Sequence, residues 1–345
     1  MAVTIRTNTK NNRFWDEWAT LFDAVIYDAD AQRNKYDDIV TALTMEKKSS
    51  RWGEKSIVMG GLGDFQVKAE GQNATQDEFS QGYEKFVQHA TFALEVQISK
   101  ELKDDNMLDD AKQKVINMVQ AYKRTRAKLA TAAITSAVGA TTNITFNSAT
   151  IDVTTGDGKA LFSEDHILKN TNGYTQGNYF NDLLGSNTSV LNKAANKMRN
   201  FRDDRGEVLG FLADTIIVPG NDPEYEDFVK RVIGSDGEVG SDHNDVNTQR
   251  GKWKLVVDPL WTPEISATNH PIIIYSSEAL KALQGAKFYD RTALDVENDV
   301  DVHSRNLTYN GFARMSITFP NWRHAMMIGA SSATSSVSDG DIYSG

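Results

Sequence analysis

Ser163 and His166 lie three residues apart and are the chain's closest approach to a nucleophile with a general base. A serine hydrolase needs its serine on a strained turn and a base that a third group orients. The sequence around this pair supplies neither feature in recognisable form. We therefore interpret the segment as a structural turn, and a monomeric hydrolase using His166 with Ser163 remains an alternative.

Other candidate sites also lack part of what their chemistry needs. Gly60–Gly63 resembles a dinucleotide loop, but the Gly-x-Gly-x-x-Gly spacing fails and no helix is expected after it. Asp236–Glu238 and Asp242–Asp245 lack the glycine and the closing glutamate of a calcium loop. The chain has no cysteine, which excludes thiolate metal sites and disulfides. We predict no catalytic, cofactor-binding or metal-binding residues, no cofactor, and no enzymatic activity.

Composition and charge are typical of a soluble globular protein. They argue against a DNA-binding surface and against a membrane-spanning segment. The net charge of -10 argues against a basic surface that neutralises phosphates. No apolar run reaches about 18 residues, so no membrane-spanning helix or membrane partner is expected. The first residues lack the apolar core of a secretory signal, and none is expected.

The first third of the chain predicts an arm, a hairpin and a strand. Residues 13–30 are apolar at helical spacing, which indicates a helix that packs either in the subunit's own core or on a neighbouring subunit. Residues 56–59 and 65–69 flank a Gly-rich turn and predict a projecting hairpin. Because an isolated hairpin is marginal in water, a second copy of the chain is its expected support. Residues 92–99 alternate as a half-buried strand.

The strongest helix is predicted over 107–138, with acidic residues in its first turn and Gly139 as its stop. Its length suits a spine rather than a bundle helix, because no equally long partner follows. A compact α/β pattern comes next. Its predicted elements are a helix at 189–201, a strand at 215–218, a helix from Asp222-Pro223 to Gly234, strands at 252–257 and 271–275, and a helix at 277–283. A strand through Met315 and Phe319 should return to pair near 94–98.

The segment Gly158–His166 (GKALFSEDH) resembles the Leu-Phe-Ser…His element of tailed-phage major capsid proteins, particularly the Mu-like major head subunits. The elements that follow resemble that family in their order. They are Asn181-Asp182-Leu183, a helix with Leu191, Ala195 and Met198, Asp204-Arg205-Gly206, Thr215–Pro219 before a capped helix, and Arg314…Trp322-Arg323 as a closing strand. The chain departs from the Mu-like pattern over 164–179, where Ile-Leu follows the histidine and an Asn/Gly-rich stretch comes next.

The resemblance implies an α+β protein with the HK97-like capsid fold. That fold has an N-terminal arm, an extended β-hairpin loop (E-loop), a peripheral domain with a long spine helix, and an axial α/β domain. The implied divisions are the arm 1–50, the hairpin loop 51–88, the peripheral domain 89–186 with its spine helix 107–138, the axial domain 187–300, and a returning peripheral strand with a C-terminal tail 301–345.

The function implied is that of a major capsid protein, self-assembling as hexamers and pentamers into an icosahedral shell around double-stranded DNA. Implied partners are further copies of the chain, portal and scaffold or decoration proteins, and packaged DNA bound without sequence specificity. The implied location is the virion, with assembly in the host cell cytoplasm. An encapsulin-like nanocompartment shell is the nearest alternative.

Overall fold

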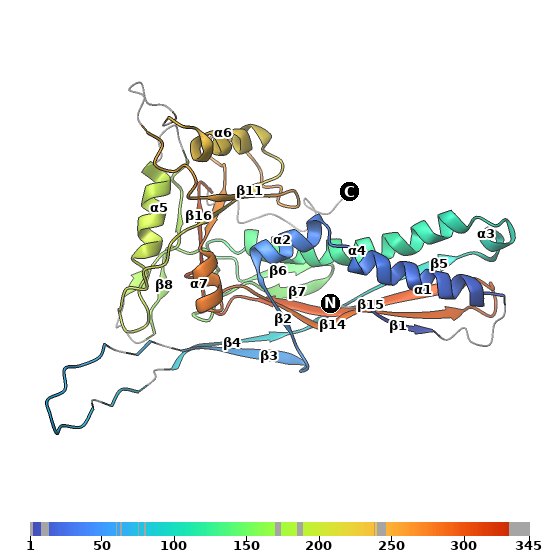
Figure 1. Ribbon diagram of the computed structural model, residues 1–345, viewed down its shortest axis with the longest axis horizontal. Coiled ribbons are helices and arrows are strands. Elements are labelled where there is room, and N and C mark those ends of the chain that lie inside the picture. The colour runs from blue at the N-terminus through green and yellow to red at the C-terminus, as the bar shows by residue number, and fades with distance from the viewer. Residues whose placement is uncertain are drawn as a thin grey trace.

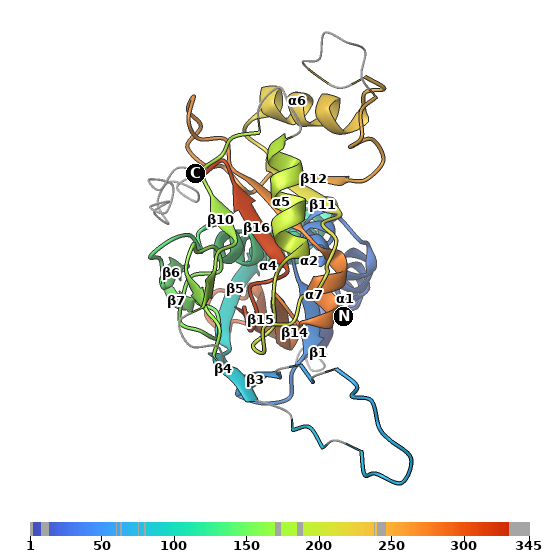
Figure 2. The same cartoon turned by 90° about the vertical axis from the view of Figure 1, so that its left-hand side faces the viewer.

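Two blocks of structure meet at one end of a long helix in the computed structural model of the protein (Figure 1). One block is an elongated sheet with helices along one face, and the other is a smaller sheet that stands across its end. A hairpin points away from both blocks, as the second view also shows (Figure 2). The structure describes residues 3–7, 14–59, 61, 62, 64–74, 76–78, 81–169, 174–184, 189–237, 239 and 246–330.

The long sheet has the strand order β1-β14-β15-β5, with β2 beside β14. Its strands are β1 (Thr4–Thr7), β2 (Met45–Lys48), β5 (Ala90–Ile98), β14 (Lys287–Val300) and β15 (Leu307–Thr318). β15 runs antiparallel to β5, pairing Leu307 with Ile98 and Met315 with Ala90. This confirms the predicted return of the chain to the strand near 94–98.

β14 lies in this sheet along its whole length, although the sequence analysis grouped 287–300 with the α/β block. It pairs antiparallel with β15 from Lys287–Thr318 to Val300–Leu307. The β14–β15 hairpin is the longest strand pair of the described chain. The sequence of β14 alone did not indicate that β15 is its partner. Periodicity in one strand does not say which sheet the strand joins.

The long helix α4 (Leu108–Thr135) covers one face of this sheet and confirms the predicted spine, ending three residues earlier than expected. At about 1.5 Å per residue its 28 residues span roughly 42 Å. Gly139 has a left-handed φ of 62° but lies beyond the C-cap, Ser136, so it does not end the helix. The C-terminal half of α4 is buried on nearly all sides and is rich in alanine, which allows other elements to approach its backbone closely.

The N-terminal helix α1 (Asp16–Ala31) packs in the subunit's own core, the first of the two alternatives left open by the sequence. Phe22 and Ile26 are fully buried against α4 and the long sheet. The rings of Trp15, Trp18, Phe22 and Tyr309 form a continuous series of edge-to-face contacts with centroids 5.7–6.1 Å apart. The short helix α3 (Lys100–Asp104) joins β5 to α4 beside these rings.

The helix α2 (Lys35–Leu43) packs against α4 and was not among the predicted elements. Its signal was present in the sequence. Asn34 accepts hydrogen bonds from the backbone of the first turn, and the Asp37 side chain accepts one in return from the Asn34 backbone. This capping box precedes an apolar stripe whose members are buried: Ile39, Val40 and Leu43.

The second block is built on a mixed sheet of order β10-β16-β13-β11-β12. Its strands are β10 (Tyr179–Phe180), β11 (Thr215–Pro219), β12 (Lys254–Asp258), β13 (Ile272–Tyr275) and β16 (Ala325–Ile328). Its helices are α5 (Ser189–Arg199), α6 (Pro223–Gly234) and α7 (Ser277–Ala282), which confirm the predicted ones. Every residue of β11, β13 and β16 is buried, as expected of strands covered on both faces.

The projecting hairpin pairs different strands from those predicted. β3 (Gly53–Met59) pairs with β4 (Gln81–Gln88), whereas 65–69 forms no strand and lies in the connection between them. The prediction failed because 65–69 alternates well and was the nearest candidate partner. β4 is about twenty residues further along the chain, so the pairing is non-local. Two smaller hairpins complete the fold, β6 (Asn143–Phe146) with β7 (Ala149–Asp152), and β8 (His166–Ile167) with β9 (Thr175–Gln176).

One hydrophobic cluster joins the two blocks. It contains the C-terminal half of α4, residues of β14 and β15 such as Phe288 and Ile317, and the second sheet through Ile216 and Ile273. A separate cluster fills the far end of the long sheet beneath α1. The two sheets therefore share a core at their junction and hold each other in place.

Candidate assembly surfaces

His166 and Ser163 do not form a catalytic pair. The His166 Nδ1 atom lies 2.8 Å from a carboxylate oxygen of Asp157, and its Nε2 atom lies 3.2 Å from both the Leu161 carbonyl and the Asn178 side-chain oxygen. The Ser163 hydroxyl instead donates to Asp165. Both nitrogens of the imidazole are thus engaged elsewhere, and the ring has no exposed surface from which to act as a base.

His166 fastens the turn at 156–167 to the second sheet. Its ring stacks on Trp322, with centroids 4.3 Å apart and planes 6° from parallel. The Asn178 amide donates to the carbonyls of Leu161 and Ala325, which ties the same turn to the start of β16. The family-like Leu-Phe-Ser…His segment is therefore a structural joint in this molecule.

Burial alone would raise the pKa of the Asp157 carboxyl, but the hydrogen bond and charge of His166 outweigh it and the pKa is lowered. Such an acid stabilises the fold above its unfolded pKa of about 3.9, and its contribution is lost as the pH falls through its folded value.

We expect His166→Phe to lower the free energy of unfolding at pH 7 by about 3–5 kcal/mol, because it removes the imidazole that pairs with the buried Asp157 carboxylate. Urea unfolding of the unassembled subunit measures this. The exposed His303 offers a matched control, since His303→Phe should stay within about 0.5 kcal/mol of wild type. The deficit of His166→Phe should shrink as the pH falls below the unfolded pKa of about 3.9 and through the lowered folded pKa of Asp157. Equal stabilities for the two variants at pH 7 would contradict the role of the joint.

The structure adds no support for the other candidate sites, which are the glycine-rich turn, the acidic stretch 236–245 and the methionine pair. Much of the glycine-rich turn and most of the acidic stretch 236–245 lie outside the described residues. Within the part of the chain that is described, no three His, Asp or Glu side chains come together in a way that could hold a metal ion. Met326 and Met327 are buried in β16 as core residues. Among the described residues, no helix is both long enough and apolar enough to cross a bilayer.

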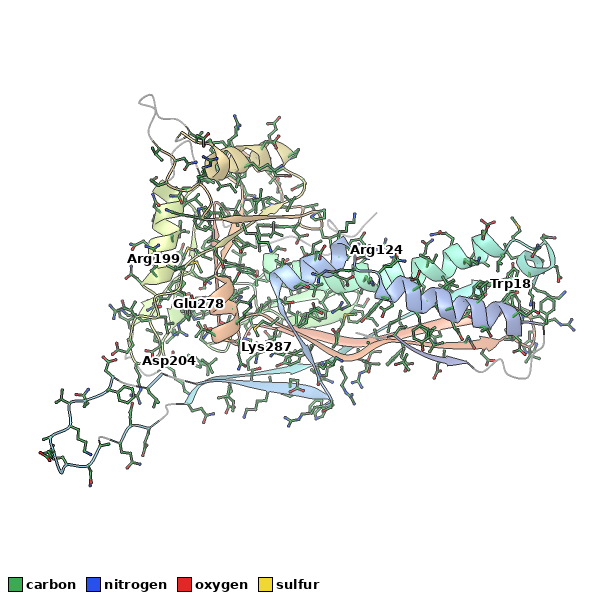
Figure 3. All side chains as sticks on the ribbon, viewed as in Figure 1. Trp18, Arg124, Arg199, Asp204, Glu278 and Lys287 are labelled. Carbon is green, nitrogen blue, oxygen red and sulfur yellow. The ribbon has the colours of Figure 1, made fainter. Side chains whose placement is uncertain are left out.

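The connection between β3 and β4, residues 60–80, is called the projecting loop below. Phe65 and Val67 in it are as exposed as in an extended peptide, at 106% and 101%. At its base, Arg205 binds both carboxylate oxygens of Asp77 at 2.8 and 2.9 Å and donates to the Glu78 carbonyl. Figure 3 shows Asp204, beside this arginine, where the hairpin leaves the body. The loop is thus anchored at its base, while Phe65 and Val67 remain fully exposed.

The hairpin that carries the loop also exposes apolar side chains. Trp52, Ile57 and Phe86 are 64%, 46% and 49% exposed, and the rings of Trp52 and Phe86 lie 5.3 Å apart. Contiguous exposed apolar surface on a soluble protein marks a binding surface more often than isolated apolar residues do. Hairpin and loop together therefore form a candidate interface. The structure confirms a hairpin in this part of the chain but pairs β3 with β4 and not with 65–69.

A buried ionic cluster fixes the N-terminal elements to the body. Arg126 of α4 binds Glu46 at 2.8 Å, Asp290 at 2.9 Å and Asp37 at 3.5 Å. Lys123, one turn earlier, donates to the backbone carbonyls at the end of α1 and binds Asp37 at 3.2 Å. Burial raises the pKa of Asp290 to about 6, and the charge and hydrogen bond of Arg126 offset only part of this rise. Sequence gave no sign of this cluster, whose members come from four separated segments.

Comparisons with known proteins match this chain to phage capsid proteins. A family model described as "Phage capsid protein" matches residues 82–326. The capsid of the native GTA particle matches with a TM-score of 0.52 at 11% identity, covering 86% of this chain and 91% of that chain. Mycobacterium phage Patience matches with a TM-score of 0.52 at 10% identity, covering 96% and 93% respectively. Gordonia phage Cozz matches with 0.50 at 10% identity, covering 85% and 86%. A search of curated proteins finds no match. At identities of 10–11%, the structural similarity establishes a shared fold and nothing more.

Proposed function

The chain belongs to the phage capsid protein family and has the HK97-like fold, and from this we infer that it is the major head subunit of a tailed phage, located in the virion. We propose that it assembles as hexamers and pentamers into an icosahedral shell around double-stranded DNA. The observation that carries this proposal is the exposed apolar hairpin and loop, which need a partner of the kind that a second subunit supplies.

We propose the following roles for the parts of the chain. The second sheet with α5, α6 and α7 is the axial domain, which meets its copies around the capsomer centre. The long sheet with α4 is the peripheral domain. Since β14 is hydrogen-bonded to β15 and β16 to β13, the division runs between residues 286 and 287 and again after β15. The hairpin contacts neighbouring subunits, whereas α1 and α2 of the implied arm pack in their own subunit.

The remaining partners are also proposals. Portal and scaffold or decoration proteins would complete the head, and assembly would occur in the host cytoplasm. A chain with a net charge of -10 suits a shell that encloses DNA without sequence-specific binding, because it offers little to hold phosphates. A structural role, with no reaction catalysed, fits the engaged state of both His166 nitrogens.

Light scattering and electron microscopy of the purified protein test the proposal. We expect closed particles in the megadalton range whose shells are built from hexamers and pentamers of the subunit. A stable monomer at high concentration would refute it. An encapsulin-like nanocompartment would also form particles, and the content separates the two: particles from infected cells should protect double-stranded DNA from nuclease rather than enclose a protein cargo.

A further inference from the structure

The face of the long sheet opposite α4 gathers positive charge near the root of the hairpin. On β15, Met315 and Ile317 belong to the core, so Arg314 and Ser316 point to the opposite face. His89, between β4 and β5, lies on the same face, because its Nδ1 atom is 2.9 Å from the Ser316 hydroxyl. These residues are therefore placed where the hairpin strand β4 leaves the sheet.

β14 adds two cations to this face. The Lys287 amine donates to the Ser56 hydroxyl of β3 at 3.1 Å, where the hairpin meets the long sheet (Figure 3). Arg291 occupies an irregularity of β14 beside Arg314, so the two arginines lie at the same level of neighbouring strands. Lys287, Arg291 and Arg314 are called the basic cluster below.

Lys287 differs from the other buried cations of the described chain. Four of them each lie within 3.2 Å of a carboxylate oxygen: Lys85, Lys123, Arg126 and Arg323. Lys287 is 6% exposed and donates to Ser56, but no described carboxylate lies within 4.0 Å of its amine. A buried charge is costly unless an opposite charge accompanies it. The position therefore calls for an anion.

The two arginines of the basic cluster lack a counter-charge as well. Neither Arg291 nor Arg314 makes an ion pair or a hydrogen bond within the ranges that the structure describes, and the Nε atom of each is buried. Asp290, the neighbour of Arg291, binds Arg126 on the α4 side of the sheet instead. A buried N–H group without a protein partner is a place where a bound water or ion is expected.

The charges around the cluster are unbalanced. Burial lowers the pKa of both Lys287 and His89. Positive neighbours lower these pKa values further: Lys47 for Lys287, and Arg314 and Arg291 for His89. Among the described acids, Glu54 is the one whose charge opposes this effect at both groups. A chain with a net charge of -10 thus holds a local excess of positive charge here.

We propose that the basic cluster binds a small oxyanion such as inorganic phosphate. The guanidinium groups of Arg291 and Arg314 donate to its oxygens, and the Lys287 amine adds charge beside them. The ion is a free one rather than part of a nucleic acid, because Lys287 is almost fully buried under the hairpin. It joins the root of the hairpin to the long sheet. This site goes beyond the proposed function and does not depend on it.

Thermal unfolding of the unassembled subunit tests the site, at pH 7 in sodium phosphate against sodium chloride of equal ionic strength. An ion that binds only the folded chain raises the unfolding midpoint, by about 4 °C at a hundred times its dissociation constant. Arg291→Gln/Arg314→Gln should lose this shift. Without phosphate, this variant should unfold no earlier than wild type, because two like charges have been removed. Titration calorimetry should find one phosphate per wild-type subunit.

The matched control is Arg124→Gln/Arg231→Gln, which removes the same charge from exposed positions of α4 and α6 and should keep the full shift. Equal shifts in the two double variants, or no saturable binding of phosphate to wild type, would overturn the site. Equally tight binding of a duplex oligonucleotide would overturn the assignment to a small ion. Calorimetry uses the wild-type chain, so the test stands even if a variant fails to fold. None of these results bears on the capsid function, which is measured on assembled particles.

Discussion

Replacing residues 60–80 by Asn-Gly should give a folded subunit that forms no closed shell. Met59 and Gln81 are cross-strand partners, so a two-residue turn can join β3 directly to β4. Neither Phe65 nor Val67 of the deleted loop is buried in its own subunit. Shortening the loop from about twenty residues to two lowers the entropic free-energy cost of closing it by roughly 2 kcal/mol. The subunit should therefore be at least as stable as wild type in urea, while electron microscopy should find no particles.

The matched control for this deletion keeps the loop's length and removes only its apolar content. Phe65→Ser/Val67→Ser should fold as wild type and assemble poorly, because the exposed side chains provide the contact and not the backbone alone. Shells of normal size from the deletion variant would show that the projecting loop is dispensable. Normal shells from the double serine variant would assign its role to the backbone.

Arg126→Met should lower the free energy of unfolding of the subunit at pH 7 by about 3–5 kcal/mol. The change leaves the buried Asp290 without its cation and frees Glu46 from α4. Arg124→Met is the control, since Arg124 is exposed on the same helix (Figure 3) and should stay within about 0.5 kcal/mol of wild type. Urea unfolding of the unassembled subunits gives both values.

A second substitution separates the charge from the packing of Arg126. Arg126→Met/Asp290→Asn should recover part of the lost stability, because the double variant leaves no buried charge at Asp290. The raised pKa of Asp290, about 6, also sets a pH window. A carboxyl with a raised folded pKa favours the fold most below its unfolded value of about 3.9, and this advantage declines as the pH rises through 6. The deficit of Arg126→Met should therefore be smaller at pH 4 than at pH 8. Equal deficits at both would point to lost packing alone.

Local signals in the sequence were sufficient for several elements. Asp222 caps α6 by accepting a hydrogen bond from the Tyr225 backbone, Pro223 begins the helix, and Gly234 ends it, all as predicted. The stripe of α4 was equally plain, since a helix of that length repeats its pattern many times. Both cases depend on residues within a few positions of one another.

The errors arose where the partner of a segment was distant. β3 pairs with β4 across the projecting loop, whereas the sequence favoured the nearer 65–69. β14 joins β15 rather than the block that precedes it in the chain. The Arg126 cluster gathers acids from positions 37, 46 and 290, which no spacing rule connects. The exposure of Phe65 and Val67 could have been inferred from their position in a stretch otherwise poor in apolar residues, but their alternation was taken for a strand.

The alanine-rich end of α4 has a consequence for how one chain can build a closed surface. Side chains such as Ala130 and Ala133 are fully buried in the core that the two blocks share, and their small size lets neighbouring elements pack close to the helix there. We expect such a close-packed junction to resist bending when the same subunit meets five-fold and six-fold surroundings. Differences in curvature would then be taken up at the contacts between subunits.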